Sequence, residues 1–116
     1  MSLALPDDGG LLGRDPVLAD IVRRLRDALQ PDRIYLFGSR ARGDAGTDSD
    51  YDLMVVVRDD MPAPLRRPGV AYKALRGTGA AADVLIWTQG AFQSRLSLRA
   101  SLPTTVVEEG TLLYES

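Results

Sequence analysis

Two short segments of this chain carry residues suited to phosphoryl-group chemistry. One is the turn Gly38–Ser39, and the other is the acidic pair Asp50 and Asp52, which begins an apolar stretch. Side chains alternate between the faces of a strand, so these two acids would point the same way, about 6.5–7 Å apart at the backbone. Like charges so placed repel each other unless a cation lies between them. Magnesium suits such a pair, because it prefers oxygen ligands and is often shared with substrate phosphates.

A third acid extends this candidate metal site. Asp83 is the only acidic residue in the apolar segment 82–87. On the same face as Asp50 and Asp52, it would complete a three-carboxylate site able to hold two metal ions about 3.5–4 Å apart. Trp87 lies four residues further along the same predicted strand, where a core or interface position is favoured over contact with a nucleotide base.

Two simpler interpretations apply to the acidic residues. An isolated acidic pair is commonly a solvated part of a polar loop that runs into a strand. A calcium-binding loop, suggested by Asp48, Asp50 and Asp52, needs glycine at its sixth position, where this chain has Leu53. We therefore reject calcium, and the solvated loop remains the alternative to a magnesium site.

The Gly-Ser turn could hold the phosphates of a nucleotide. Gly38 follows the apolar segment 33–37, at a point where a positive φ and close backbone approach favour glycine. Ser39 would begin a short helical turn whose N–H groups bind phosphate oxygens. Arg40 and Arg42 would add positive charge against a triphosphate. Taken alone, Ser39 is more typical of a helix cap, and the two arginines of a solvated surface.

The elements that must position these residues follow from apolar spacing and turn signals. Asp15 followed by Pro16 is typical of a helix start, and apolar residues at helical spacing continue to Gln30 and Pro31, where the helix should end. Strands are predicted at 33–37, 50–57, 82–87 and 111–114, and further helices at 68–76, after Thr88 and at 103–109.

Composition excludes several functional classes. The net charge of −2 over 116 residues argues against a general nucleic-acid binder. The chain has neither cysteine nor histidine, which excludes disulfides, thiolate or imidazole metal sites and Ser-His-Asp catalysis. No apolar run reaches membrane-spanning length and the N-terminus lacks a secretory pattern, so we expect a cytoplasmic protein.

We expect residues 1–14 to form a flexible lead-in and residues 15–116 a single domain.

The motifs LFGSRARG at 36–43 and DSDYDL at 48–53 resemble the signature of the DNA polymerase beta-like nucleotidyltransferase superfamily. The most similar branch is the minimal nucleotidyltransferase (MNT) family, and the resemblance covers roughly residues 15–115. It implies an α+β fold in which a small mixed β-sheet packs on helices. It also implies transfer of a nucleoside monophosphate from a nucleoside triphosphate, with Gly38 and Ser39 holding the triphosphate. Asp50, Asp52 and Asp83 would hold magnesium, with two ions expected.

The resemblance also implies an acceptor and a partner. MNT proteins are known as antitoxins that transfer AMP from ATP to a tyrosine of a HEPN-domain ribonuclease toxin. We therefore expect a protein adenylyltransferase with a HEPN toxin as partner and no direct contact with nucleic acid or membrane. Because the chain has no histidine, a carboxylate such as Asp83, or water, would accept the proton of the acceptor hydroxyl.

Two other functions stay open at this point. The chain could be a non-catalytic antitoxin that blocks its partner by contact alone, although an intact set of three aspartates argues against this. It could also be a nucleotidyltransferase that modifies a small molecule of the aminoglycoside type, although relatives of that kind carry a further domain.

Overall fold

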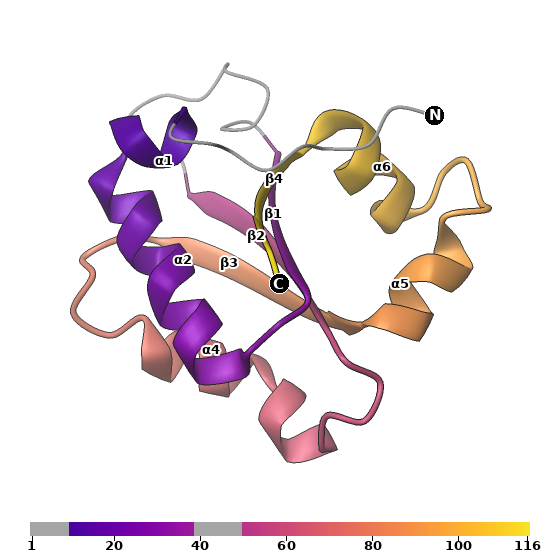
Figure 1. The fold of residues 1–116 in the computed structure, drawn as a ribbon, viewed down its shortest axis with the longest axis horizontal. Helices are drawn as coiled ribbons and strands as arrows, with labels where there is room; N and C mark the ends of the chain where they lie inside the picture. The colour runs from indigo at the N-terminus through magenta and orange to yellow at the C-terminus, as the bar shows by residue number, and fades with distance from the viewer. Residues whose placement is uncertain (1–9, 39–49) are drawn as a thin grey trace.

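A four-stranded mixed sheet forms the middle layer of the protein (Figure 1). The computed structural model describes residues 10–38 and 50–116. Strand β1 pairs antiparallel with both β2 and β4, and β3 pairs parallel with β2, which gives the order β3-β2-β1-β4. The strands are β1 (Arg33–Phe37), β2 (Tyr51–Val57), β3 (Ala82–Thr88) and β4 (Thr111–Glu115). The predicted α+β fold with a small mixed sheet is therefore confirmed.

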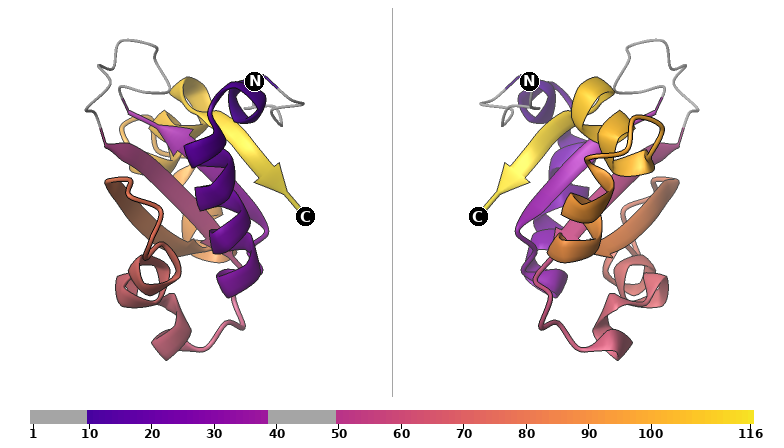
Figure 2. Two further views of the ribbon diagram at one scale, coloured as in Figure 1. Left: turned by 90° about the vertical axis from the view of Figure 1, so that its left-hand side faces the viewer. Right: turned by 90° about the vertical axis from the view of Figure 1, so that its right-hand side faces the viewer.

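Helices cover both faces of this sheet (Figure 2). One face carries a cluster of buried apolar side chains from α2 and α4, and the opposite face carries a second cluster from α5 and α6. The helices are α1 (Leu11–Arg14), α2 (Pro16–Leu29), α4 (Pro68–Ala74), α5 (Gln89–Arg95) and α6 (Leu102–Glu109), with a 3-10 helix, η1 (Ala63–Arg66), between β2 and α4.

Strand β2 contributes to both clusters because its side chains alternate between the two faces of the sheet. Leu53, Val55 and Val57 lie in the cluster under α2 and α4, whereas Met54 and Val56 lie in the cluster under α5 and α6. All five side chains have no exposed surface. A strand buried on both faces reads as a continuous apolar run, which explains the unbroken sequence LMVVV.

Helix α2 begins and ends where local signals predict. The Asp15 carboxylate accepts a hydrogen bond from the Leu18 N–H at 3.0 Å, and Pro16 occupies the first helical position. Gln30 ends the helix in the left-handed conformation, with φ of 46°. One stripe of the helix is buried against the sheet, and it consists of Leu18, Ile21, Val22, Leu25 and Leu29.

The N-terminal region differs from the expectation. Leu11–Arg14, which we expected within a flexible lead-in, form the short helix α1. Leu11 and Leu12 are partly buried and pack against the cluster under α2 and α4, so this turn belongs to the folded structure. The predicted helix at 68–76 ends two residues early, at Ala74, and residues 1–9 lie outside the described part of the chain.

The helices of the described part are short. None of the helices within residues 10–38 and 50–116 is long and apolar enough to cross a bilayer.

Candidate functional site

Two of the predicted acidic residues lie side by side at one end of the sheet. Because β2 and β3 are parallel, their first residues meet at the same end, and the antiparallel strand β1 finishes there. Asp52 is paired with Asp83 on one side and with Phe37 on the other. Neighbouring strands are about 4.8 Å apart, so the backbones of the two aspartates are separated by roughly that distance.

Strand alternation places Asp52 and Asp83 on the same face of the sheet. The residues that follow at every second position, Met54 on β2 and Leu85 on β3, both belong to the cluster under α5 and α6. Asp52 is half-buried and Asp83 is exposed. Trp87 continues the same face of β3 and is partly buried against that cluster, which agrees with a core or interface position.

Gly38 lies directly against the carboxylate of Asp52. It follows β1 with φ of +77°, a conformation that side chains other than glycine rarely adopt. A Cβ atom at this position would lie 2.3 Å from Oδ2 of Asp52, far inside van der Waals contact. Gly38 and the carboxylate of Asp52 therefore occupy one place in the structure.

The other predicted site residues are only partly placed. Asp50 is exposed and directly precedes β2, two residues before Asp52. Among the described residues, no three acidic side chains gather closely enough to hold a metal ion. The three-carboxylate site thus remains a prediction, of which the structure brings Asp52 and Asp83 together. Ser39, Arg40 and Arg42 lie outside the described residues, together with the expected helical turn at 39–43.

A partly buried hydrogen bond links the start of β2 to the start of α2. The hydroxyl of Tyr51, which stands between the two acids in sequence, donates to Oδ2 of Asp15 at 2.7 Å. The other oxygen of Asp15 caps α2 by accepting from Leu18. Tyr51 is only 7% exposed. The sequence predicts the helix cap but not this contact, because no local pattern connects residues 36 positions apart.

A tyrosine beside Asp83 was not predicted from the sequence. Tyr72 extends from α4, and its hydroxyl donates to Oδ1 of Asp83 at 3.4 Å. Both side chains are exposed, so this hydroxyl lies at the open edge of the candidate site. No sequence signal could have identified it, since the contact depends on how α4 packs beside β3.

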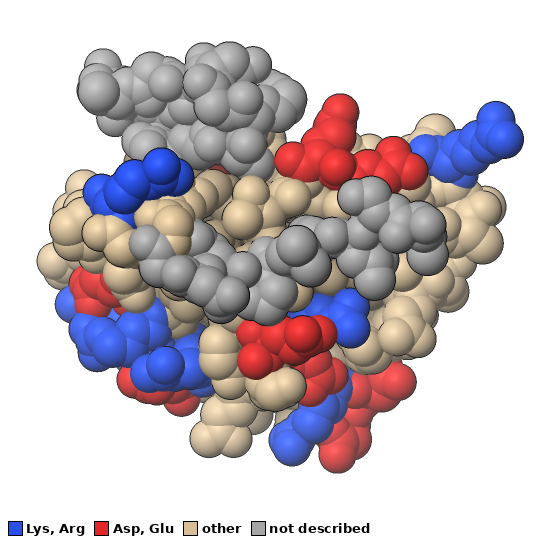
Figure 3. Space-filling view, turned by 45° about the horizontal axis from the view of Figure 1, so that its top comes forward, with Lys and Arg blue, Asp and Glu red and all other residues tan. Residues whose placement is uncertain are grey.

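The surface around this end of the molecule carries charges of both signs. Figure 3 shows Lys and Arg side chains interspersed with Asp and Glu over the visible part of the described residues, with no single broad basic area among them.

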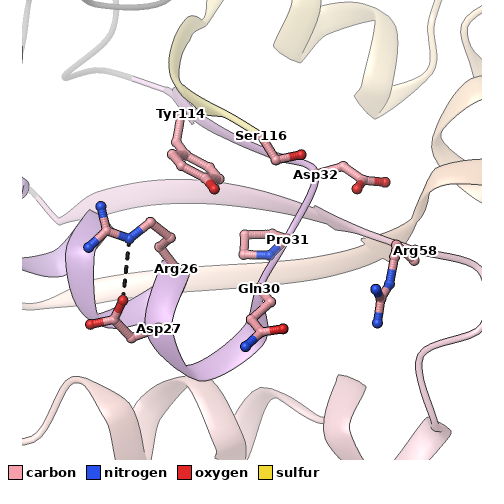
Figure 4. Close-up of a pocket in the computed structure, with 8 residues that line it drawn as sticks. All are labelled: Arg26, Asp27, Gln30, Pro31, Asp32, Arg58, Tyr114 and Ser116. Carbon is pink, nitrogen blue, oxygen red and sulfur yellow. Dashed lines mark hydrogen bonds and ion pairs between the residues drawn. The ribbon is translucent and has the colours of Figure 1, made fainter.

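A cavity of about 440 Å³ lies at the opposite end of the sheet (Figure 4). It opens between the end of α2, the start of β1 and the end of β4, and an ion pair between Arg26 and Asp27 lies at its wall. None of the described site residues lines it; its walls are formed by Arg26, Asp27, Gln30, Pro31, Asp32, Arg58, Tyr114 and Ser116.

Comparison with known protein families shows which family the chain belongs to. Residues 18–110 match the nucleotidyltransferase domain, which is most of the chain. The chain belongs to the nucleotidyltransferase domain family. No curated protein sequence matches this nucleotidyltransferase, whereas solved structures do.

The solved structures similar to this nucleotidyltransferase include toxin–antitoxin complexes. A chain of a toxin–antitoxin crystal structure with AMP-PNP is 27% identical, with a TM-score of 0.59 over 84% of this chain and 73% of that chain. A chain from a MntA–HpeT variant is 25% identical, with a TM-score of 0.56 over 85% of this chain and 72% of that one.

A third structure shows the same fold. It contains a tri-AMPylated Shewanella oneidensis HEPN toxin in complex with its MNT antitoxin, and the matching chain is 23% identical with a TM-score of 0.54, over 87% of this chain and 71% of that one. These three structural neighbours of this nucleotidyltransferase thus all come from toxin–antitoxin structures, one of which contains a HEPN toxin with an MNT antitoxin.

Proposed function

We propose that this nucleotidyltransferase transfers AMP from ATP to a tyrosine hydroxyl of a HEPN-domain toxin and so acts as the antitoxin of the pair. The observation that carries the proposal is the in-register pair of Asp52 and Asp83 against the Gly38 turn. Its nucleotide is suggested by the similar complex with AMP-PNP, and its acceptor by the AMPylated HEPN toxin of the third structure.

The donor set of this site fits magnesium. Two carboxylates on neighbouring strands offer hard oxygen ligands, and the space left by the missing side chain of Gly38 keeps the carboxylate of Asp52 close to the turn. Asp52 and Asp83, joined by Asp50, would hold the metal, which when bound would stabilise negative charge on the phosphoryl oxygens. Gly38 and Ser39, with Arg40 and Arg42, would hold the triphosphate.

The chain's own groups then account for the transfer. The acceptor hydroxyl oxygen attacks the α-phosphorus of ATP, the bond from that phosphorus to the bridging oxygen breaks, and pyrophosphate leaves. Asp83 takes the proton of the hydroxyl, because the chain has no histidine for this role. The open edge of β3 leaves Asp83 exposed, so a hydroxyl delivered by another protein can reach it.

The test is incubation of the protein with labelled ATP, magnesium and a HEPN toxin. We expect label on a tyrosine of the toxin, and we expect Asp52→Asn to abolish it because the variant loses a metal-binding charge without a change in size. Asp60→Asn is the matched control, since Asp60 is an exposed acid that pairs at the surface with Arg58 at 3.3 Å.

The alternatives give different results in the same experiment. Tight binding of the toxin without any label would replace the proposal with a non-catalytic antitoxin. With an aminoglycoside added as a second acceptor, label on the aminoglycoside and none on the toxin would identify a small-molecule nucleotidyltransferase. Full transfer by the Asp52→Asn variant would show that the proposed site assignment is wrong.

A further inference from the structure

A hydroxyl of the chain itself lies within hydrogen-bond distance of the proposed general base, Asp83. Tyr72 donates to Oδ1 of Asp83 at 3.4 Å. A general base must lie within hydrogen-bond reach of the proton it takes, and such contacts are often long before substrate binds. We propose that Tyr72 is an adenylylation site, so that this nucleotidyltransferase modifies itself in cis. This inference rests on the proposed function, because it uses the same nucleotide and the same base.

The position of Tyr72 is set by a well-packed helix. Ala71 of α4 and Leu75, which follows the last residue of α4, are buried in the cluster under α2 and α4. Arg24 of α2 donates to the carbonyl oxygens of Ala74 and Arg76 at 3.3 and 2.7 Å, which links the end of α4 to α2. The backbone that carries Tyr72 is therefore fixed beside β3 while the side chain stays accessible.

Strand β3 is an edge of the sheet, and this makes the contact possible. Within the described part of the chain, no further strand covers β3 on its outer side, so a side chain from α4 can reach around that edge to Asp83. Tyr72 is 43% exposed, which leaves room for a nucleotide to approach its hydroxyl. Asp52, the register partner of Asp83, lies on the next strand inward.

The other tyrosines are not placed for this reaction. The chain has four tyrosines, and all of them lie within the described residues. Tyr35 is 2% exposed, and the hydroxyl of buried Tyr51 is bonded to Asp15. Tyr114 pairs with Ile34, near the start of β1, and lines the cavity at the far end of the sheet.

The proposed step balances without any further reactant. The phenolic oxygen of Tyr72 forms a bond to the α-phosphorus of ATP, and the bond between that phosphorus and the bridging oxygen to the β-phosphorus breaks. Pyrophosphate leaves with the bonding electrons, and the phenolic proton passes to Asp83. The product is a phosphodiester between Tyr72 and AMP, and nothing is oxidised or reduced.

The test uses the purified chain alone, with ATP labelled in the α-phosphate and with magnesium. We expect intact mass analysis to show one added adenylyl group and peptide mapping to place it on Tyr72. Tyr72→Phe should carry no label, whereas Tyr114→Phe, altered at the far end of the sheet, should be labelled like the wild type. Label on any other residue would overturn the proposal.

A mixing experiment tests whether the transfer occurs in cis. Affinity-tagged wild-type chain is mixed with an untagged Asp52→Asn variant that retains Tyr72, and the two are separated after incubation with labelled ATP. Transfer in cis predicts label on the tagged chain only and a labelling rate per chain that does not change on tenfold dilution. Label on the Asp52→Asn chain would show transfer between copies and would contradict the proposal.

Titration with AMP-PNP and magnesium distinguishes failure of this proposal from failure of the proposed function on which it rests. If the wild type binds AMP-PNP and modifies a HEPN toxin but Tyr72 stays unlabelled, the self-modification proposal fails and the proposed function stands. If the wild type neither binds AMP-PNP nor labels any protein, both fail together.

Discussion

At the scale of single residues, Gly38 is subject to two constraints that usually occur apart. Its φ of +77° favours glycine for conformational reasons, and the carboxylate of Asp52 fills the space where a side chain would lie. A substitution here changes the backbone and displaces a site residue together. Gly77 shares only the first constraint, with φ of +88° and no described atom within 4 Å of the position that a Cβ would take.

This contrast gives a paired prediction. Gly38→Ala and Gly77→Ala should each lower the free energy of unfolding by about 1–2 kcal/mol, the cost of the left-handed conformation. Only Gly38→Ala should also reduce transfer, by about 100-fold, because it displaces the Asp52 carboxylate. Urea unfolding and the labelled-ATP assay measure the two effects. Equal activity in the two variants would show that the contact with Asp52 is unimportant.

At the scale of elements, the site depends on how strand β2 is joined to helix α2. Asp15 uses one carboxylate oxygen to cap α2 and the other to accept from Tyr51. The start of the strand that carries Asp52 is therefore fixed relative to the longest described helix. Because Tyr51 and Asp15 belong to different elements, mutation can separate the contribution of their hydrogen bond from that of the helix cap.

We expect Tyr51→Phe to lower the free energy of unfolding by about 1.5–3 kcal/mol, because it removes a partly buried hydrogen bond to a charged group. Asp15→Ser should keep the helix cap and lose the contact with Tyr51. In a double-mutant cycle the two variants should therefore show coupling of about 1 kcal/mol or more. Strict additivity would mean that the two side chains do not interact in solution.

A second link between elements joins α2 to the end of α4. Arg24→Ala should lower the free energy of unfolding by about 1–2 kcal/mol, since the guanidinium donates to two backbone carbonyl oxygens that end α4. Arg23→Ala is the matched control, because exposed Arg23 pairs with Asp20 on its own helix. Its effect should stay within about 0.5 kcal/mol. Chemical denaturation of both variants checks the difference.

At the scale of the whole molecule, the two apolar clusters share the strands between them. Val55 of β2 lies in the cluster under α2 and α4, and the next residue, Val56, lies in the cluster under α5 and α6. Because β2 supplies side chains to both clusters, one cluster cannot lose its packing while β2 keeps its position in the other. The sheet with its two helical layers should therefore unfold as one cooperative unit.

Trp87 provides the measurement, because it is the only tryptophan and packs against the cluster that does not contain Val55. Val55→Ala should lower the free energy of unfolding by about 2–3 kcal/mol. Trp87 fluorescence and far-ultraviolet circular dichroism should report the same shifted midpoint. Two separate midpoints would show that the layers on the two faces of the sheet unfold independently.

The positions of helices and strands were largely predictable because the signals for them are local. Asp15 and Pro16 begin α2 where expected, and each predicted strand is present to within one residue. Helix α1 was missed because a turn as short as Leu11–Arg14, with Gly13 inside it, has too little apolar periodicity to be recognised. Its stability comes from packing against residues elsewhere in the chain.

The sequence by itself determined the residue types of the proposed site: the glycine turn, the acids at 50, 52 and 83, and the lack of any histidine that could replace them. Only the tertiary structure decided which groups meet. The parallel register places Asp83 beside Asp52, and the packing of α4 along the open edge brings Tyr72 to Asp83. Local spacing specifies elements, but contacts between elements depend on packing and register, which no single segment encodes.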